Sequence, residues 1–293
     1  MIWLFASQGN KHEEALVAAM RLGTTKGEIV TVPKQEFKAT VKQVPGVILA
    51  GVKSDHGPLL RKLVGMGKRV LYLDKGYIRS KNLSPDLMDY YRVSVDSFQP
   101  HAYMHRYPHP SDRWDVLEVP IQKLVKTDNR RFVLYAGSSQ KYCNFYGLGD
   151  ATEYAQNVIR RVQEIDRFNR TIIYRPKPSW RGAVPIKGTV FSKYGLSMGQ
   201  ELAHTQVLIT HGSNACLEAA LHGVPSIVLG EGVTKSISSA GLEEVARPKR
   251  VGREALTKLC YTIAYQQWSL DDFRSGAAFE YITDVINYLS KTR

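Results

Sequence analysis

Short runs of aliphatic, β-branched and aromatic residues alternate with longer amphipathic stretches along most of the chain. The short runs predict strands at residues 2–6, 28–32, 46–52, 69–73, 132–136, 171–175, 207–210 and 226–229. The amphipathic stretches predict helices at residues 11–22, 57–66, 151–168, 214–222, 253–268 and 271–289. This alternation is typical of parallel βαβ units, in which helices cover both faces of a sheet.

A proline-rich stretch interrupts the alternation at residues 99–120, and a polar run follows at 126–131. We therefore expect two α/β domains, the first spanning residues 1–128 and the second residues 129–270. Residues 271–293 are expected to form a C-terminal helix that can cross back to the first domain. Two such domains facing each other would form a central cleft, with ligands at the carboxyl ends of the strands.

The helix expected at 151–168 has a recognisable start. Asp150 lies at the N-cap position and Glu153 follows three residues later, which is the pattern of a capping box.

Composition excludes disordered, collagenous and coiled-coil classes, since 43% of the 293 residues are hydrophobic and 23% are charged. The charge is less ordinary: 40 Lys and Arg against 27 Asp and Glu give a net charge of +13. Such a surplus predicts attraction to polyanions, namely nucleic acid, an anionic membrane surface or phosphorylated substrates.

Cellular location follows from the cysteines and the N-terminus. Cys143, Cys216 and Cys260 are widely spaced, which disfavours a disulfide framework or a cysteine zinc site and favours the cytoplasm. The N-terminal run lacks the features of a signal peptide, and no apolar run reaches the roughly 18 residues of a membrane-spanning helix.

The most specific stretch is residues 210–230, which read THGSNACLEAALHGVPSIVLG. A strand is expected to end at Thr210, a tight turn to follow, and a helix to start with Ser213 or Asn214 as its cap. The free amides of that start, together with the helix dipole, would attract an anion. Glu218, one turn further on, could accept hydrogen bonds from vicinal hydroxyls of a sugar. The plainer interpretation is an ordinary βαβ unit with a capped helix.

This stretch resembles the C-terminal-domain signature of GT-B glycosyltransferases, including capsule-polysaccharide and phage-encoded DNA-modifying types. The resemblance is specific over roughly residues 205–232, architectural over the rest of the second half, and weak in the first half. It implies a GT-B fold of two facing Rossmann-like domains. It further implies that the turn and helix start contact the diphosphate of a nucleotide sugar and that Glu218 holds the ribose. The donor residues so implied are His211, Gly212, Ser213, Asn214 and Glu218.

Two further segments suit the same donor. Arg175 and Lys177 follow a strand on a proline-containing loop, where two cations could meet a diphosphate, although a solvated basic loop has the same composition. Gly137 and Ser138 end another strand and could let a phosphate approach, but as a motif they are weak.

Absent motifs narrow the class of enzyme. The chain has no D-x-D sequence, no P-loop and no G-x-G-x-x-G fingerprint. A metal-independent GT-B enzyme needs none of these, because helix amides and basic side chains can meet the charge of its leaving group. We therefore expect no cofactor, with a nucleotide sugar, by default a UDP-sugar, as co-substrate.

The resemblance also implies that the first domain holds the acceptor and, in inverting enzymes, the catalytic base. Asp74 is the first candidate for that base and His56 the second, because both follow predicted strands. The alternative for each position is a turn or cap role, with Asp55 capping the helix at 57–66. Further residues that could line the acceptor side are Ser7, Gln8, Asn10, Tyr77 and Arg92.

Residues 89–95 and 103–107 mix aromatic and basic side chains, which could grip bases and phosphates or equally form an edge strand and loop packed on the core. His101, His105 and His109 are spaced four apart, but Pro108 and Pro110 disfavour the continuous helix that a metal face would need.

The charge surplus favours DNA as the acceptor-bearing partner, since a DNA-modifying enzyme must hold a dense phosphate array and flip out its target base. The favoured acceptor is thus a hydroxymethylated pyrimidine in double-stranded phage-type DNA. One alternative is a transferase that builds a bacterial capsule or lipopolysaccharide-type glycan. Another, of a different class, is a non-catalytic nucleic-acid-binding protein on a GT-B scaffold.

Overall fold

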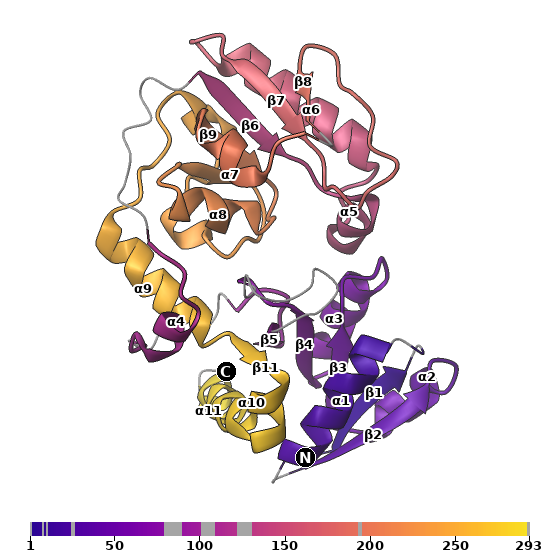
Figure 1. Cartoon of the computed structure of the whole chain (residues 1–293). Coiled ribbons are helices and arrows are strands. Elements are labelled where there is room, and N and C mark those ends of the chain that lie inside the picture. Colours follow the sequence, from indigo (N-terminus) through magenta and orange to yellow (C-terminus); the bar gives the residue numbers. More distant parts are fainter. Residues whose placement is uncertain are drawn as a thin grey trace. The chain divides into compact units, whose positions relative to one another are not determined.

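The computed structural model describes residues 2–7, 9, 11–24, 27–78, 90–100, 109–121, 131–192 and 195–291. The chain divides into two compact units (Figure 1). Unit 1 comprises residues 1–117 and 262–293, and unit 2 comprises residues 118–261. The C-terminal segment therefore belongs to the same unit as the N-terminus.

Unit 1 is built around a six-stranded sheet in the order β11-β5-β4-β3-β1-β2. Its strands are β1 (Ile2–Ser7), β2 (Glu28–Pro33), β3 (Gly46–Ala50), β4 (Arg69–Lys75), β5 (Tyr90–Val95) and β11 (Gln267–Ser269). The first four are parallel, as the sequence pattern predicts. Every residue of β3 is buried, because helices cover both faces of a parallel sheet.

The last two strands of this sheet differ from the sequence prediction. β5 runs antiparallel to β4, and β11 runs antiparallel to β5. A helix was expected at residues 253–268, but α9 ends at Ala264 and Gln267–Ser269 forms the strand. The buried Gln267 side chain exchanges two hydrogen bonds with the backbone of Ile78, at 3.0 and 3.2 Å. Pairing with a segment far away in sequence thus overrides the local helical pattern.

The helices of unit 1 are α1 (Lys11–Gly23), α2 (Phe37–Thr40), α3 (His56–Gly65), α4 (Asp112–Val116), α10 (Leu270–Ser275) and α11 (Ala277–Lys291), with a 3₁₀ turn at Val41–Gln43. The single helix expected at 271–289 is two helices, because Gly276 adopts a left-handed φ of 89° between them. Phe273, Phe279 and Ile282 from these helices join the core around β1 and β5.

Unit 2 contains a five-stranded parallel sheet in the order β10-β9-β6-β7-β8. Its strands are β6 (Phe132–Ala136), β7 (Thr171–Arg175), β8 (Val190–Phe191), β9 (Thr205–Thr210) and β10 (Ser226–Val228). The pattern predicts β6 and β7 at their observed bounds. Val133, Tyr135, Ile172 and Ile209 pack with helix α6 in one core cluster.

The helices of unit 2 are α5 (Gln140–Tyr146), α6 (Ala151–Ile165), α7 (Met198–Leu202), α8 (Ala215–Leu221) and α9 (Arg253–Ala264), with 3₁₀ turns at Lys235–Ile237 and Leu242–Ala246. Most of helix α9 belongs to unit 2, and its last three residues, 262–264, are assigned to unit 1. Asp150 caps α6 by accepting hydrogen bonds from the amides of Thr152 and Glu153, which confirms the N-cap half of the predicted capping box. The helix ends at Ile165 and not at 168, since Asp166 already has extended backbone.

Two findings bear on the environment of the chain. The three cysteines are free thiols with buried side chains. Within the described residues, no helix combines the length and the apolar character needed to cross a bilayer.

Candidate functional site

The carboxyl edge of the unit 2 sheet brings four strand ends into register. Ala136 of β6 lies beside Arg175 of β7 and beside Thr210 of β9, which in turn lies beside Val228 of β10. Arg175 is the last residue of β7, Glu218 lies on α8, and the other donor residues expected from the sequence lie in the segments that follow these strands. The sheet therefore gathers segments 137–138, 175–177 and 211–214 at one edge, where ligands of α/β folds bind.

At two positions of this edge the neighbouring atoms are so close that only glycine fits. A Cβ on Gly212 would overlap the carbonyl oxygen of Glu231 and the hydroxyl of Tyr142. A Cβ on Gly230 would overlap the ring of His211. The amide of Gly230 donates to the carbonyl of His211 at 2.7 Å, so the turns after β9 and β10 are bound to each other.

His211 is buried in a cage of tyrosines. Its ring centroid lies 5.4 Å from that of Tyr146, 5.5 Å from Tyr154 and 6.0 Å from Tyr142. Nδ1 of His211 is 2.7 Å from the hydroxyl of Tyr154. Burial, assisted by the positive charge of Lys235, lowers the pKa of His211 to about 4. The imidazole is therefore neutral at pH 7, where it can exchange hydrogen bonds without carrying charge.

The start of α8 is held by Ser213 and Thr210. The hydroxyl of Ser213 accepts from the amide of Ala215 at 3.3 Å, and the hydroxyl of Thr210 accepts from the amide of Ser213 at 3.2 Å. Asn214 occupies the N-cap position, but its side chain makes no cap hydrogen bond. Of the two caps considered from the sequence, Ser213 is the one that binds an amide.

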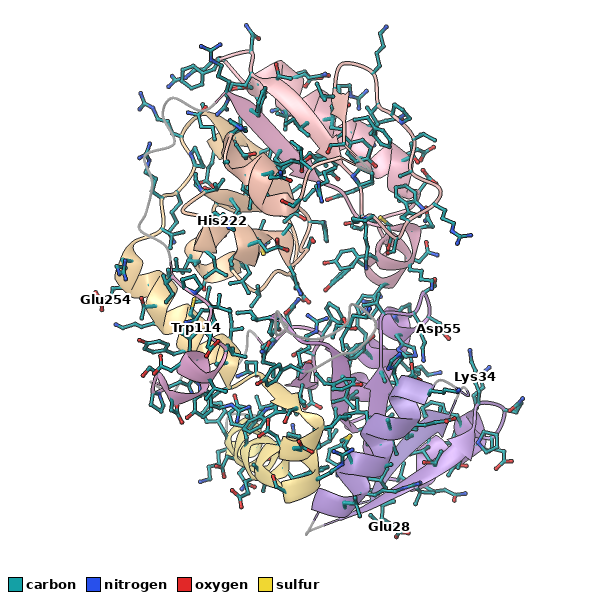
Figure 2. The ribbon with its side chains drawn as sticks, viewed as in Figure 1. Glu28, Lys34, Asp55, Trp114, His222 and Glu254 are labelled. Atoms are coloured by element: carbon teal, nitrogen blue, oxygen red, sulfur yellow. The ribbon has the colours of Figure 1, made fainter. Side chains whose placement is uncertain are left out.

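Glu218 lies one turn into α8 with an exposed side chain. Desolvation by neighbouring protein raises its pKa, while the charges of His222 and Arg175 act in the opposite direction. His222 ends the same helix (Figure 2), where its Nδ1–H donates to the carbonyl of Glu218 at 2.8 Å. The carboxylate is thus accessible and within electrostatic reach of Arg175.

Arg175 is anchored by a carboxylate that the sequence pattern does not single out. Its Nη1 donates to Glu201 Oε2 at 2.9 Å and to the carbonyl of Leu196 at 2.8 Å. The side chain of Glu201 is only 2% exposed, and its other oxygen accepts from the hydroxyl of Ser192. Arg175 is therefore a positioned cation and not the freely solvated loop residue of the alternative interpretation.

The turn after β6 is tied to the same strand end. The amide of Gly137 donates to the carbonyl of Arg175 at 2.9 Å, and a Cβ on Gly137 would lie 2.7 Å from the ring of Tyr174. Ser138 is 9% exposed. Lys177 is exposed two residues beyond Arg175, where its carbonyl accepts from the amide of Trp180.

In unit 1, Asp74, Arg92 and Tyr77 form one cluster. Asp74 Oδ2 accepts from Arg92 Nη2 at 2.9 Å, and the Asp74 side chain keeps 21% of its surface exposed. The buried Arg92 guanidinium lies 4.0 Å from the ring centroid of Phe98 and 5.4 Å from that of Tyr77. Arg92 lies on interior strand β5 and not on an edge strand, and Tyr77 donates to Gln99 at 2.7 Å. The structure brings these three candidates together, with Arg92 and Tyr77 packed into the core.

His56 lies at the start of α3 and is 5% exposed. Its Nδ1–H donates to the carbonyl of Gly51 at 3.0 Å. Burial and the nearby positive charge of Lys53 lower its pKa to about 4. Asp55 makes no side-chain cap bond to α3, contrary to the cap interpretation; it points instead toward Lys34 at 3.9 Å, in an exposed pair (Figure 2).

Several residues considered from the sequence lie outside the described part of the chain. These are Gln8, Asn10, His101, His105 and the whole of 103–107, and Ser7 is described only as the last residue of β1. Among the described residues, no group of three or more His, Cys, Asp or Glu side chains is arranged to hold a metal ion.

The site also contains residues that sequence reasoning missed, namely Glu201, Tyr154 and Lys235. The hydroxyl of Tyr154, on α6, lies 2.7 Å from Nδ1 of His211. Lys235 is half-buried and close enough to His211 to affect its pKa. None of these three residues lies in a glycine-containing turn after a predicted strand or in another recognisable motif, so the sequence contains no signal for them.

Comparisons with known proteins give the architecture. The sequence matches no protein-family model and no curated protein. Among solved structures, it resembles the β-Kdo 2,4-transferase of KpsC from Thermosulfurimonas dismutans, with a TM-score of 0.57 and 15% identity over 92% of this chain and 91% of that one. It also resembles the β-Kdo 2,7-transferase of KpsC from the same organism, with a TM-score of 0.54 and 16% identity over 96% and 98% of the two chains. At this identity the likeness establishes the fold: the chain has the GT-B fold of glycosyltransferases.

Proposed function

We propose that the chain is a glycosyltransferase that moves a sugar from a nucleotide-activated donor to a hydroxyl of a glycan acceptor, in the synthesis of a bacterial capsule or lipopolysaccharide-type polysaccharide. The observation that carries this proposal is the carboxyl edge of the unit 2 sheet. There a positioned cation, an exposed carboxylate and a close-packed glycine turn lie on neighbouring strand ends and the helix that follows.

Each part of this edge matches one part of a nucleotide sugar. Arg175, with Lys177 beside it, offers positive charge for the diphosphate or phosphate of the leaving group. Gly212 brings backbone amides close to that charge, and neutral His211 offers a hydrogen-bonding imidazole. Glu218 offers a carboxylate for the vicinal hydroxyls of the ribose. This chemistry needs no metal ion, and metal independence is part of the proposal.

The net charge favoured DNA as the acceptor-bearing partner, whereas the comparisons favour a glycan. Two solved structures of matching fold are named as sugar transferases of KpsC, which supports the glycan alternative. Nothing in the comparisons supports DNA or a hydroxymethylated pyrimidine as acceptor, so the net charge of +13 stands alone behind that hypothesis. A glycan acceptor is therefore the better-supported choice.

For the catalytic base we propose Asp74 in preference to His56. A base must reach the acceptor hydroxyl, and Asp74 keeps 21% of its side chain exposed, whereas His56 is 5% exposed as a residue. Arg92 would hold the Asp74 carboxylate in place.

Activity on a panel of donors and acceptors tests the proposal. The purified chain is incubated with UDP-, GDP- and CMP-activated sugars, a Kdo donor included, and products are followed by mass spectrometry. We expect transfer to a capsule- or lipopolysaccharide-type oligosaccharide, unchanged by EDTA. Transfer to hydroxymethylated DNA alone would replace the acceptor, and loss of activity in EDTA would refute metal independence. Absence of both donor binding and transfer across the panel would refute the function.

Replacing Glu218 with Gln is expected to weaken donor binding about 10- to 100-fold. The charged hydrogen bonds of one carboxylate are worth about 1.5–3 kcal/mol, which converts to that range of affinity. Calorimetric titration with the nucleotide sugar measures the change. Glu164→Gln, at an exposed glutamate of α6, is the matched control and should bind the donor normally. Equal affinities for the two variants would remove Glu218 from the donor site.

A further inference from the structure

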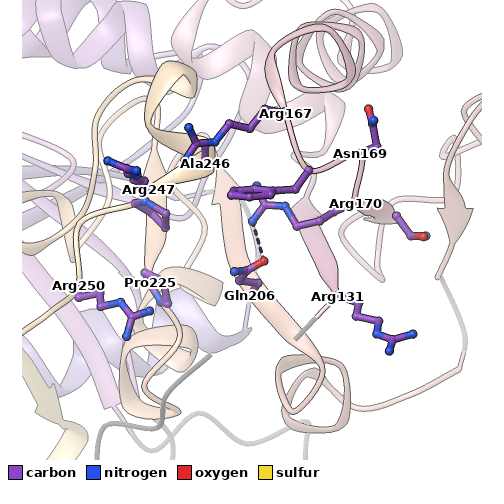
Figure 3. A pocket seen from close by; sticks show the side chains of 12 residues that line it. Arg131, Arg167, Asn169, Arg170, Gln206, Pro225, Ala246, Arg247 and Arg250 are labelled. Atoms are coloured by element: carbon purple, nitrogen blue, oxygen red, sulfur yellow. Dashed lines mark hydrogen bonds between the residues drawn. The ribbon is translucent and has the colours of Figure 1, made fainter. Parts of the chain in front are cut away.

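A strongly basic pocket lies at the amino edge of the unit 2 sheet. This edge is opposite the carboxyl edge with Arg175, His211 and Glu218, which we call the donor edge. It has a volume of about 820 Å³ and is formed where the strands begin: Arg131 precedes β6, residues 167–170 precede β7, and Pro225 precedes β10 (Figure 3). Since β6 spans five residues at about 3.3 Å each, the sheet holds this pocket roughly 15 Å from the donor edge. The two sites are therefore separate.

Arg170 forms the rigid base of this pocket. It makes a buried ion pair with Asp166 at 2.7 Å, and it also donates to Gln206 at 2.9 Å and to the carbonyl of Val245 at 2.8 Å. These bonds connect the segment after α6, strand β9 and the segment before Arg247. The charge of Arg170 is compensated by Asp166, so Arg170 shapes the pocket and leaves the binding of an anion to its neighbours.

The rim of the pocket carries further positive charge. Arg131, Arg167, Arg247 and Arg250 are exposed and surround the opening (Figure 3). Within the described ranges, Arg131, Arg167 and Arg247 have no carboxylate at ion-pair distance. These arginines come from three separate segments of the chain, so the fold gathers them. Arginine presents a planar fork of donors that fits the oxygens of a phosphate group.

Phe168 adds a flat apolar surface among these cations. The residue is 52% exposed, and the guanidinium of Arg167 lies 4.9 Å from its ring centroid. An exposed aromatic ring beside arginines suits a ligand that carries a ring or an apolar portion next to its phosphate. A simple inorganic anion would use only the arginines.

We propose that this pocket is a binding site for a phosphate-bearing ligand, distinct from the donor edge. A cavity of this size accommodates a ligand of nucleotide or phosphosugar dimensions. The phosphate contacts the rim arginines 131, 167 and 247, and the remainder of the ligand lies against Phe168. The phosphate could belong to a soluble ester or to a lipid headgroup. The site does not depend on the function proposed above, because no residue is shared with the donor edge.

The test uses a charge-reversal variant and a matched control. Arg167→Glu with Arg247→Glu removes two rim cations, and Arg160→Glu with Arg161→Glu makes the same change of charge on exposed residues of α6 outside the pocket. Binding is measured by calorimetry with inorganic pyrophosphate, and by sedimentation with phosphatidylcholine vesicles that contain or lack phosphatidylglycerol. We expect the rim variant to bind at least tenfold more weakly than the control, with salt weakening the interaction for the wild type.

The probes distinguish the sources of the phosphate. Binding of pyrophosphate without vesicle binding assigns a soluble ester, and binding of the anionic vesicles assigns a lipid headgroup. Protection of Arg167 and Arg247 from phenylglyoxal by whichever probe binds, pyrophosphate or the anionic vesicles, read by mass spectrometry, separates this site from Arg175 at the donor edge. Equal affinities of the rim variant and the control for that probe, or absence of protection by it, would overturn the proposal. If duplex DNA bound to the wild type and the control but not to the rim variant, and neither pyrophosphate nor the vesicles bound, the proposal would be overturned and the pocket would be part of a nucleic-acid-binding surface.

Discussion

Replacing Glu201 with Ala is expected to lower the free energy of unfolding of unit 2 by about 3 kcal/mol, because it leaves Arg175 without its buried carboxylate. The same change also removes the acceptor of the Ser192 hydroxyl. Three of the four tryptophans lie in unit 1, so tryptophan fluorescence would report mainly on the other unit. Hydrogen exchange at the amides of β6 and β7 in increasing urea measures the stability of unit 2 itself.

The Glu201 variants also separate a structural role from a positioning role. Glu201→Gln keeps the size and one acceptor oxygen, so we expect it to lose less stability than Glu201→Ala. Both variants should weaken donor binding, because Arg175 loses its charged anchor in each. A Glu201→Ala protein with wild-type stability would show that the pair contributes nothing. Unchanged donor affinity in Glu201→Gln would show that Arg175 does not need this anchor.

Local sequence predicts β6, β7, β9 and β10 of the unit 2 sheet, because these strands are short, mostly buried and parallel, but it does not predict the two-residue strand β8, whose residues are exposed or half-buried. The residues of β6 are apolar and buried or half-buried, and in β7 the apolar residues 172–174 lie between an exposed Thr171 and a half-buried Arg175, so short apolar runs mark both strands. The same reasoning fails at β11, where Gln267 is polar and fully buried. Its side-chain bonds to Ile78 come from a segment 189 residues away, and no local pattern records such a partner.

The residues of the candidate site likewise fall into those that a local motif identifies and those that only the packing of the fold brings to the site. His211, Gly212 and Glu218 follow one strand end within eight residues, so a single turn-and-helix motif identifies them. Glu201 and Tyr154 reach that edge from other helices and act through side-chain bonds to Arg175 and His211. Such partners depend on how the helices pack on the sheet, which periodicity does not specify.

The net charge illustrates a different limit. A value of +13 predicted a polyanion, and by extension DNA. The structure shows where some of that charge gathers, at the amino edge of the unit 2 sheet around one pocket. Charge in the sequence indicates the class of ligand, but only the fold shows whether the cations form a groove for a long duplex or a pocket for a single phosphate group.

Replacing Asp166 with Ala is expected to lower the free energy of unfolding of unit 2 by about 3–5 kcal/mol, since Arg170 would remain as an uncompensated buried charge. Asp166 also accepts from the backbone amides of Phe168 and Arg170, at 3.3 and 3.0 Å. The loss would therefore loosen the base of the arginine pocket as well. Glu164→Ala removes an exposed ion pair near the end of α6, two residues before Asp166, and should change stability by less than about 1 kcal/mol.

The pH dependence of this effect has a defined sign. Burial alone would raise the pKa of Asp166, but the hydrogen bonds and charge of Arg170 outweigh it and lower the pKa in the folded protein. The carboxylate therefore stabilises the fold fully above the unfolded pKa of about 3.9 and loses that effect as the pH falls through the lower folded value. The stability difference between wild type and Asp166→Asn, measured by urea unfolding, should be constant from pH 7 to about pH 5 and shrink at lower pH. A difference that stays constant down to the acid limit would show that the Asp166 carboxylate is not held ionised by Arg170.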